Sequence, residues 1–422
     1  MPHWPPNYPS TGQIEKILTL LGNPQQKLPP VIHVTGTNGK GSVIAFLKHI
    51  FMEHGLTAHI FTSPHLLQFN ENFIIANQMI TDDLIYNLTE EIRGKLHNII
   101  NPSFFEYQTA LALLAFSKVK ADICIIECGM GARNDPTGIL TNKLASVITP
   151  ITLDHQEYLG DSIEAIAAHK AYVMKGAQIA INAPQTNMAT TLLTNYSKLV
   201  NCEIINHQID YDFDIANNQL AYIDISREKI SYYNLPTIQG DHQITNLAVA
   251  LSVIKNQSLF KFEDQLINQA ITKTCWPGRL ENMSHFISDT IPGNSEIWFD
   301  GAHNEAGAFA LAKWLATQSS DKENLIIYGR SENKNHHQFL QHLNHNNKII
   351  FTVVKNEPLS ESKFNFTKFL KNHPQYNIKI FDNLESIFSD HLNKSFPPLR
   401  IIICGSLYLY RDLHQISQMR SR

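Results

Sequence analysis

The stretch VIHVTGTNGKGS, residues 31–42, joins a β-branched run to a glycine-rich turn that contains Lys40. β-Branched runs are typical of buried strands, and apolar side chains recur at helical spacing after the turn. A strand that leads through such a turn into a helix gathers backbone N–H groups and the positive helix end around one point. We therefore expect this turn to bind a phosphate group, with Lys40 adding a positive charge.

The spacing of the turn differs from that of the usual P-loop. The common pattern places four residues between its first glycine and the Gly-Lys pair, whereas only two separate Gly36 from Gly39. Taken alone, the turn leaves an alternative open, a glycine-rich connection that carries a solvated lysine. The residues that we expect to contact a phosphate are Gly36, Thr37, Asn38, Gly39, Lys40, Gly41 and Ser42.

Strand-like runs alternate with helical patterns through the first half of the chain. HIFTS at 59–63, DICIIEC at 122–128 and ASVIT at 145–149 are strand candidates, and a long helical stretch begins near Ser162. This alternation predicts an α/β fold with a doubly wound, mostly parallel sheet and a P-loop-type turn. From about 177 to 235 the sequence becomes rich in short alternating runs, which we interpret as a β-rich extension of the first domain.

A second α/β pattern runs from EIWFD at 296–300 to LRIIICGS at 399–406. We interpret it as a smaller C-terminal α/β domain of the Rossmann-like kind. The stretch 281–295 contains one proline and one glycine and is the expected hinge. The predicted domains are therefore 1–283 and 284–422.

Composition excludes several classes of protein. The 422 residues are 43% hydrophobic and 17% charged, as in ordinary globular proteins, and the net charge of −4 provides no positive field for nucleic acid or an anionic membrane. Five scattered cysteines do not form a disulfide framework. The N-terminal stretch MPHWPPNYPS lacks the features of a signal peptide, and no apolar run is long enough to span a bilayer. We expect a cytoplasmic monomer with small-molecule partners.

Side chains that can bind a metal follow two of the predicted strands. Glu127 closes the run DICIIEC, and Asp154 and His155 follow shortly after ASVIT. Open α/β sheets bind ligands beyond the carboxyl ends of their strands, and Mg²⁺ prefers hard oxygen ligands. These residues are therefore metal-site candidates, with a surface glutamate and a structural histidine as the alternatives.

Nine blocks, in order between about residues 15 and 410, resemble the folylpolyglutamate synthase and dihydrofolate synthase family, relatives of the Mur amide ligases. The blocks are GNPQQKLPPVIHVTGTNGKGS, FTSPHLLQFNEN, FFEYQTALALLAF, IIECGMGAR, ITLDHQEYLG, GDHQITNLAVA, WPGRLE, FDGAHNEAG and CGSLYLY. The resemblance implies an ATP-dependent, amide-forming ligase whose nucleotide lies between two domains. The substrates that it implies are dihydropteroate, reduced folates and L-glutamate.

The resemblance also implies roles for individual residues. The loop from Gly36 to Ser42 corresponds to the family's ATP phosphate loop, with Lys40 as a catalytic residue. The implied Mg²⁺ ligands are Ser63, Glu127, His155 and Lys170, and the implied adenine, phosphate and ribose contacts are Asn246, Arg279 and Asp300. His303 lies near these contacts in the sequence, and Lys40, Lys170 and His303 are the implied catalytic residues.

Lys170 matches a lysine that members of this family carry as a carbamate. The modification converts a cation into an anion that can bind a second Mg²⁺, and it requires a lysine neutral enough to react with CO₂. Without the family, an exposed helical lysine would be the alternative. On the substrate side, the pterin or folate is expected near SPHLLQFNEN and FFEY, where the faces of Phe104 and Phe105 can stack on a flat ring, with core phenylalanines as the alternative. The implied contacts are Phe105, Glu106 and Arg133.

Departures from the family pattern lie mainly on the substrate side. They include Asn72, where an arginine is common, Asn134 within GARNDPTGI, and His169, where a glutamate is usual. They leave open whether the protein performs both ligations or only folylpolyglutamate synthesis. Two further alternatives are a Mur-type ligase, which predicts about 100 residues before the loop, and a non-catalytic nucleotide-binding module, which predicts altered metal and phosphate positions.

Overall fold

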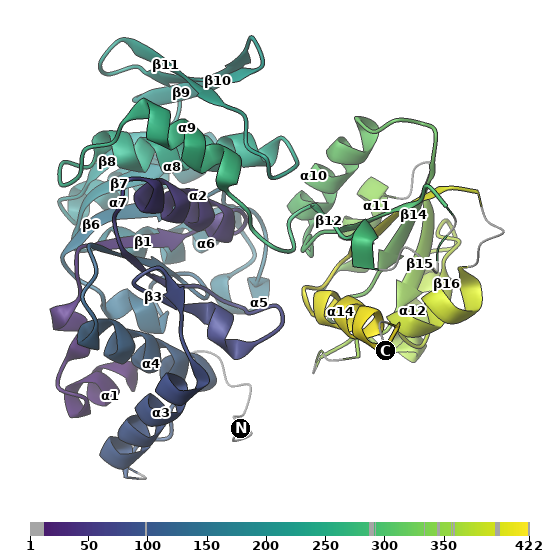
Figure 1. The fold of residues 1–422 in the computed structure, drawn as a ribbon, viewed down its shortest axis with the longest axis horizontal. Helices are drawn as coiled ribbons and strands as arrows, with labels where there is room; N and C mark the ends of the chain where they lie inside the picture. The colour runs from purple at the N-terminus through teal and green to yellow at the C-terminus, as the bar shows by residue number, and fades with distance from the viewer. Residues whose placement is uncertain are drawn as a thin grey trace. The chain divides into compact units, whose positions relative to one another are not determined.

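The computed structural model describes residues 12–97, 99–286, 291, 293–332, 334–343, 347–355, 357, 359–392 and 397–420. The N-terminal stretch considered above as a signal peptide and the hinge proline Pro292 lie outside the described residues. The chain forms two compact units, Met1–Thr237 with His242–Cys275, and Ile238–Asp241 with Trp276–Arg422 (Figure 1). This division falls before the expected boundary at 283/284, because Glu281–Asn282 forms strand β12 in the sheet of the second unit.

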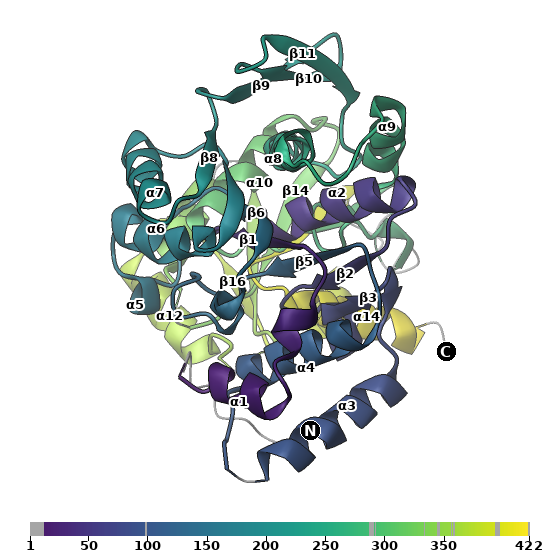
Figure 2. The ribbon, with the colours of Figure 1, turned by 90° about the vertical axis from the view of Figure 1, so that its left-hand side faces the viewer.

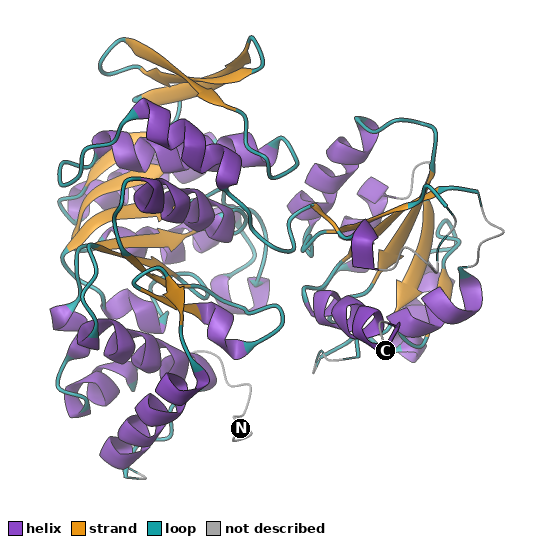
Figure 3. Ribbon diagram, viewed as in Figure 1, coloured by secondary structure: helices purple, strands orange, loops and turns teal. Residues whose placement is uncertain are grey.

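The first unit contains an eight-stranded sheet with the order β4-β3-β2-β5-β1-β6-β7-β8 (Figure 3). The parallel strands are, in spatial order, β2, β5, β1, β6, β7 and β8. The antiparallel strands β3 and β4 are added next to β2 at one edge. The strands are β1 Val31–Thr35, β2 Ala58–Phe61, β3 Phe73–Ile75, β4 Gln78–Met79, β5 Ile123–Glu127, β6 Lys143–Ile148, β7 Ala177–Asn182 and β8 Glu203–Asn206. The doubly wound, mostly parallel sheet predicted from the alternating pattern is confirmed.

Helices cover both faces of this sheet (Figures 1 and 2). Three lie on one face: α2 Lys40–Glu53, α8 His242–Asn256 and α9 Asp264–Lys273. The other face carries α1 Ile14–Leu20, α3 Asp82–Leu96, α4 Phe104–Lys118, α6 Ile163–Ala171 and α7 Asn187–Leu199. Short helical segments are η1 Pro24–Lys27, η2 Phe69–Asn72, η3 Pro136–Ile139, α5 Gln156–Leu159 and η4 Tyr172–Met174.

The decisive strand, turn and helix form where the sequence predicts them. All five residues of β1 are buried, and α2 begins at Lys40 after Gly39, close to the expected start. The long helix expected from Ser162 is shorter, because α6 ends at Ala171 and the chain turns at Gly176, with φ of 74°, to enter β7. Burial of β1 between β5 and β6 places the turn at the carboxyl edge of the sheet.

The β-rich extension is a three-stranded antiparallel sheet of β9 Tyr211–Ala216, β10 Gln219–Asp224 and β11 Lys229–Asn234. Tyr211, Tyr222 and Tyr233 are buried, and the Tyr222 hydroxyl lies 3.1 Å from the Ser252 hydroxyl of α8. This small sheet therefore packs against the helical layer of the first unit through buried aromatic side chains.

The second unit contains a six-stranded sheet with the order β12-β13-β17-β14-β15-β16, parallel except for β12. Its strands are β12 Glu281–Asn282, β13 Glu296–Phe299, β14 Glu323–Tyr328, β15 Lys348–Thr352, β16 Lys379–Phe381 and β17 Leu399–Cys404. Its helical segments are η5 Ser284–Phe286, α10 Glu305–Ala316, α11 His336–Leu343, α12 Lys363–Asn372, α13 Leu384–Ser386, η6 Ile387–His391 and α14 Tyr408–Arg420. This is the smaller Rossmann-like domain predicted from the second pattern. In the described part of the chain, no helix combines the length and apolar character needed to cross a membrane.

Candidate active site

Two glycines of the turn occupy positions where a side chain would not fit. Gly36 has φ of 139°, and a Cβ there would collide with the hydroxyl of Thr149. Gly39 has φ of 93°, and its Cβ would collide with the side-chain oxygen of Asn246. Because glycine alone tolerates both the backbone conformation and the close approach, the sequence of the turn follows directly from its shape.

The turn is attached to the segment that follows β6. The backbone N–H groups of Thr37 and Asn38 donate to the carbonyl of Pro150 at 3.0 and 3.4 Å. The Thr37 hydroxyl donates to the Thr152 carbonyl at 3.1 Å and accepts from the Thr152 N–H at 3.1 Å. Sequence reasoning did not identify these partners, although they directly follow the strand run ASVIT.

Lys40 folds back over the turn that precedes it. Its ammonium group donates to the carbonyls of Gly36 and Thr37 at 3.3 and 3.2 Å. It also lies 3.8 Å from a carboxylate oxygen of Glu127. The positive charge is thus held at the carboxyl edge of the sheet, where the turn could hold a phosphate.

Glu127 links the ends of two neighbouring strands. It closes β5, its side chain is buried, and its second carboxylate oxygen accepts a hydrogen bond from the Ser63 N–H at 3.1 Å. Ser63 follows β2, and the peptide bond between Ser63 and Pro64 is cis. The structure therefore brings together Lys40, Ser63 and Glu127, which lie far apart in the sequence.

Lys170 reaches the same turn from α6. Its side chain is buried, and its ammonium nitrogen donates to the Gly36 carbonyl at 2.7 Å. Burial, followed by the nearby charge of Lys40, lowers the pKa of Lys170 to about 7. The alternative of an exposed helical lysine is therefore excluded, and a substantial fraction of this amine is neutral near pH 7.

Asp154 and His155 follow β6 at the same edge of the sheet. Asp154 is buried, and its carboxylate accepts a hydrogen bond from the backbone N–H of His155 at 2.9 Å. His155 adopts φ of 52° directly before α5, a left-handed conformation that is uncommon outside glycine.

The donor groups at this edge suit Mg²⁺. Among the described residues, no group of three or more His, Cys, Asp or Glu side chains is assembled to hold a metal on its own. The edge offers instead a buried carboxylate beside Ser63. It also offers the Thr149 hydroxyl, which is buried against Gly36 and has no hydrogen-bond partner within the described part of the chain. Few protein ligands, all hard, are what Mg²⁺ uses when phosphate and water complete its shell.

Asn246 lies on α8 and packs against the turn at Gly39. Its amide nitrogen donates to the side chain of Gln243 at 3.0 Å, which fixes the orientation of the buried amide. Asn246 belongs to α8, whereas Lys40 begins α2. A second helix therefore packs against the start of α2.

The substrate-side residues have different environments. The Phe105 ring covers Gly129, where a Cβ would lie 2.6 Å from it, and stacks on Phe61 with ring centroids 5.9 Å apart. The Glu106 carboxylate is buried and accepts from the N–H and hydroxyl of Ser103, both at 2.9 Å. Glu106 is thus part of a capping box that begins α4, and the S-x-x-E spacing of Ser103 and Glu106 is the sequence signal for this structural role.

Asp135 organises the loop that follows Glu127, and sequence reasoning did not single it out. Its buried carboxylate accepts from the N–H groups of Met130 and Thr137 at 2.8 and 2.9 Å. Burial raises the pKa of this carboxyl, and hydrogen bonds from Thr137 and the loop partly offset the effect. Arg133 projects from the same loop as an exposed side chain, and its N–H donates to the His169 carbonyl at 3.2 Å.

In the second unit, the predicted nucleotide contacts gather after β13. The Asp300 carboxylate accepts from the N–H groups of Leu280 and Ala302 at 2.9 and 2.8 Å. The Arg279 guanidinium packs against Gly301, and the His303 ring donates from Nδ1 to the Gly301 carbonyl at 2.9 Å. Asp300, Arg279 and His303 are therefore brought together at the carboxyl edge of the second sheet.

A buried arginine that sequence reasoning missed supports this second cluster. Arg330 donates to the His303 carbonyl at 2.9 Å and to the Tyr328 hydroxyl at 3.3 Å. The Tyr328 hydroxyl in turn lies 2.8 Å from His336, which pairs with Glu361 at 2.9 Å. The network fixes the backbone of the loop that carries His303.

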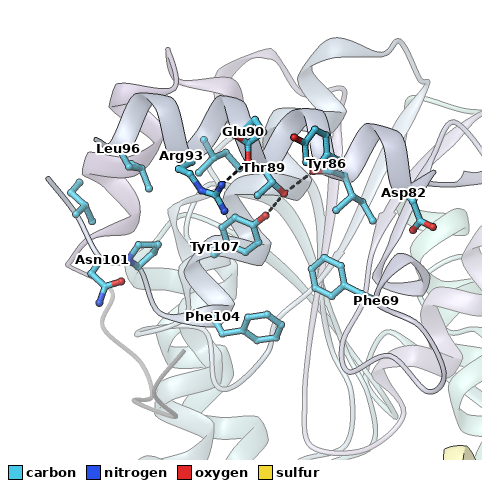
Figure 4. Close-up of a pocket in the computed structure, with 14 residues that line it drawn as sticks. Phe69, Asp82, Tyr86, Thr89, Glu90, Arg93, Leu96, Asn101, Phe104 and Tyr107 are labelled. Carbon is cyan, nitrogen blue, oxygen red and sulfur yellow. Dashed lines mark hydrogen bonds and ion pairs between the residues drawn. The ribbon is translucent and has the colours of Figure 1, made fainter. Parts of the chain in front are cut away.

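A separate pocket of about 620 Å³ lies between α3 and α4 (Figure 4). Its wall includes the rings of Phe69, Phe104 and Tyr107, and the charged groups of Arg93 and Glu90 pair at 2.7 Å. Phe69, Phe104 and Tyr107 belong to the stretches SPHLLQFNEN and FFEY, whereas the expected contacts Phe105, Glu106 and Arg133 do not line the pocket.

Comparisons with known proteins agree with this geometry. The family model described as the Mur ligase middle domain matches residues 34–254, and the model described as the dihydrofolate synthetase C-terminal domain matches residues 282–416. The folylpolyglutamate synthase of Lacticaseibacillus casei is 30% identical over 430 residues, covering 97% of this chain and 95% of that protein. The dihydrofolate synthase/folylpolyglutamate synthase of Bacillus subtilis is 28% identical over 356 residues, covering 79% and 78%.

A solved structure extends the match to the whole fold. FolC of Escherichia coli in complex with DHPP and ADP has a TM-score of 0.85 and 22% identity to this chain, covering 100% of this chain and 96% of that one. Fold and site define an ATP-dependent, amide-forming ligase of the Mur type. Within that class, the chain belongs to the folylpolyglutamate synthase and dihydrofolate synthase family.

Proposed function

We propose that this protein adds L-glutamate to dihydropteroate and to reduced folates, using ATP to activate the accepting carboxylate. The observation that carries the proposal is the cluster around Gly36. Two lysine ammonium groups, from Lys40 and Lys170, donate to its carbonyl, and a buried carboxylate lies beside the first of them. The cluster lies at the carboxyl edge of a parallel sheet, where α/β proteins bind their ligands.

The reaction needs activation because a carboxylate oxygen is a poor leaving group. A carboxylate oxygen of the folate substrate attacks the γ-phosphorus of ATP, the bond to ADP breaks, and an acyl phosphate forms. The unprotonated amine of glutamate then attacks the acyl carbon, and the tetrahedral intermediate expels phosphate. Lys40 and the backbone N–H groups that begin α2 stabilise negative charge on the transferring phosphoryl group, which is the main task of the protein in such transfers.

Mg²⁺ is part of the proposal. Ser63, Glu127, His155 and carbamylated Lys170 would hold two ions, and their chemistry is neutralisation of the phosphate charge. The carbamate forms when the neutral Lys170 amine attacks CO₂ and loses one proton. The lowered pKa of Lys170 supports this modification, because it increases the reactive neutral fraction near pH 7.

The remaining residues bind and orient the substrates. We assign Asn246, Arg279 and Asp300 to the nucleotide and His303 to orientation of reacting groups. Phe105 offers a ring face for the pterin, as its partial exposure and its contact with Gly129 support.

Two residues expected to contact substrate act in different ways in this proposal. Arg133 contacts the folate substrate directly. Glu106 acts through its capping box, which fixes the start of α4 next to Phe105.

We place the enzyme in the cytoplasm as a monomer. Its five cysteines form no disulfide, which suits a reducing compartment.

The proposal is tested by glutamate-dependent ADP release from the purified protein with ATP, Mg²⁺ and bicarbonate. Dihydropteroate and a reduced monoglutamyl folate are supplied in parallel reactions. We expect turnover with both. Turnover with the folate alone would identify a monofunctional folylpolyglutamate synthase, an alternative favoured by the substrate-side departures at Asn72 and His169. No release with either substrate, despite ATP binding, would refute the assignment.

A further inference from the structure

An open groove of about 900 Å³ runs between α6 and α7 of the first unit. Its floor and one wall include Tyr172 and the apolar side of α7. A polar stripe of α7 also lines the groove and consists of Asn187, Thr191 and Asn195, all of which are exposed. These three residues recur every fourth position, so that their polar side chains lie on one face about 6 Å apart along the helix axis.

The groove contains a single charged side chain, that of Arg133. The guanidinium of Arg133 makes no hydrogen bond or ion pair with any residue that the structure describes. The adjacent His169 cannot supply a counter-charge, because a histidine side chain is either neutral or positive. The groove therefore presents one unpaired cation and no acid, a combination that attracts an anion.

The topology connects this groove to the catalytic edge. Helix α7 begins five residues after β7 ends at Asn182, so its first turn lies at the carboxyl edge of the sheet. At the same edge, Arg133 follows the loop that begins at Glu127, and its N–H is bonded to the residue that precedes Lys170. The groove thus starts near the proposed centre and extends along α7 for about 20 Å, given the rise of an α-helix.

We propose that this groove binds the γ-glutamyl tail of a polyglutamylated folate. This inference rests on the proposed function. A polyglutamylated folate reacts through its terminal glutamate, so the rest of its γ-glutamyl tail must extend away from the reaction centre. Arg133 pairs with a tail carboxylate, and the stripe on α7 donates hydrogen bonds to the repeated carboxylates and amides. The methylene groups of the tail pack on Tyr172 and Tyr196.

The pocket between α3 and α4 is a poorer match for the same ligand (Figure 4). It carries Asp82 and Glu90, and its cation Arg93 is already paired with Glu90. A chain of carboxylates entering that pocket would meet like charges, which disfavours binding. The difference in charge therefore distinguishes the two cavities as sites for such a tail.

The test compares substrates that differ in tail length. Initial rates with the full-length protein give kcat/KM for dihydropteroate, which has no glutamate, and for monoglutamyl and triglutamyl reduced folates. Asn195→Asp places a like charge in the groove, and Arg133→Gln removes its cation. We expect each variant to lower the ratio of kcat/KM for triglutamyl folate to that for dihydropteroate by about tenfold, a typical effect of one charged contact.

Lys198→Gln is the matched control. It removes a cation from α7 that does not line the groove, so we expect it to leave the ratio unchanged. Equal losses with all three substrates, or no change in the ratio for either groove variant, would overturn the inference.

A second measurement separates this inference from the proposed function. Calorimetric binding of γ-linked triglutamate to the full chain requires no turnover. We expect binding to the wild type that Asn195→Asp weakens and Lys198→Gln preserves. Wild-type protein that turns over folates but binds no triglutamate would refute the groove alone, whereas wild-type protein that binds it but releases no ADP would refute the ligase assignment alone.

Discussion

The ammonium group of Lys170 donates a 2.7 Å hydrogen bond to the carbonyl of Gly36, the first glycine of the phosphate turn. Two segments separated by more than 100 residues thus meet at one buried oxygen. Because burial lowers the pKa of Lys170 to about 7, its neutral form dominates above that pH and its protonated form below. This single contact links the geometry of the turn to the chemistry of the lysine.

Lys170 is therefore predicted to form a carbamate more readily at pH 8 than at pH 6. Carbon-13 NMR with labelled bicarbonate should show a carbamate signal that grows across this range and is missing in Lys170→Met. The variant should also lose most turnover. A wild-type signal that is lacking at pH 8, with full activity, would contradict the prediction.

Alanine substitutions at the two glycines of the turn should respond differently when Asn246 is truncated. Gly36→Ala and Gly39→Ala should each reduce ATP binding strongly, because both combine a positive φ with a collision. Asn246→Ala removes the collision at Gly39, so the double variant should recover part of the stability lost by Gly39→Ala. Asn246→Ala should not restore stability to Gly36→Ala, because the side chain that a Cβ at Gly36 would strike is that of Thr149. Thermal unfolding and ADP titration measure both effects, and identical behaviour of the two double variants would contradict this assignment.

Glu127→Gln should raise the Mg²⁺ concentration needed for half-maximal activity and lower kcat by about a hundredfold, as for loss of one electrostatic group at a reaction centre. The amide oxygen of glutamine can still accept from the Ser63 N–H, so the fold should persist. The control is Glu91→Gln, which alters an exposed ion pair with Lys118. An unchanged Mg²⁺ dependence in Glu127→Gln would exclude the residue as a ligand.

Glu106 tests whether a residue next to the expected pterin contact acts through structure. Glu106→Ala and Ser103→Ala each break the same capping box, and each should lower stability by about 1 kcal/mol. Because Ser103 and Glu106 act as a pair, the double variant should cost less than the sum of the two. Urea unfolding provides the values. Strict additivity, together with a KM effect for Glu106→Ala alone, would restore a direct substrate role.

Lys143 is the buried first residue of β6, and its ammonium group donates to the Val173 carbonyl at 2.7 Å. Burial lowers its pKa from 10.5 to about 8. Between about pH 8 and 10.5 the unfolded state therefore holds more protons than the folded state, so the contribution of Lys143 to stability increases as the pH rises through this window. Below pH 8 the full cost of burying the charge is present.

Lys143→Met should accordingly stabilise the protein at pH 7 by about 1 kcal/mol or more, as other replacements of buried charges do. The Ser146 hydroxyl still donates to the Val173 carbonyl at 2.7 Å, so the acceptor stays satisfied. The gain should shrink at pH 9.5. Urea unfolding at the two pH values checks this, with exposed Lys16→Gln as the control, and destabilisation at both values would contradict it.

The sequence by itself determined the fold class, because its strands and helices are set by local periodicity. The β-branched run of β1, the glycines of the turn and the apolar stripe of α2 follow from residues close together in the chain. The candidate site could be anticipated to the same extent. Lys40 is recognisable from the turn, and Glu127 from its place at the end of a buried run.

Only the tertiary structure decided which groups surround these residues. Thr149 against Gly36, Asp135 within its loop and Arg330 beneath His303 depend on which strands and helices become neighbours, and no local pattern encodes that order. Glu106 is a different case, because its capping contact with Ser103 is local and the S-x-x-E spacing could have indicated it. The lowered pKa of Lys170 likewise arises from burial and from a second lysine 130 positions away in the sequence, so the chemical character of this residue exists only in the folded chain.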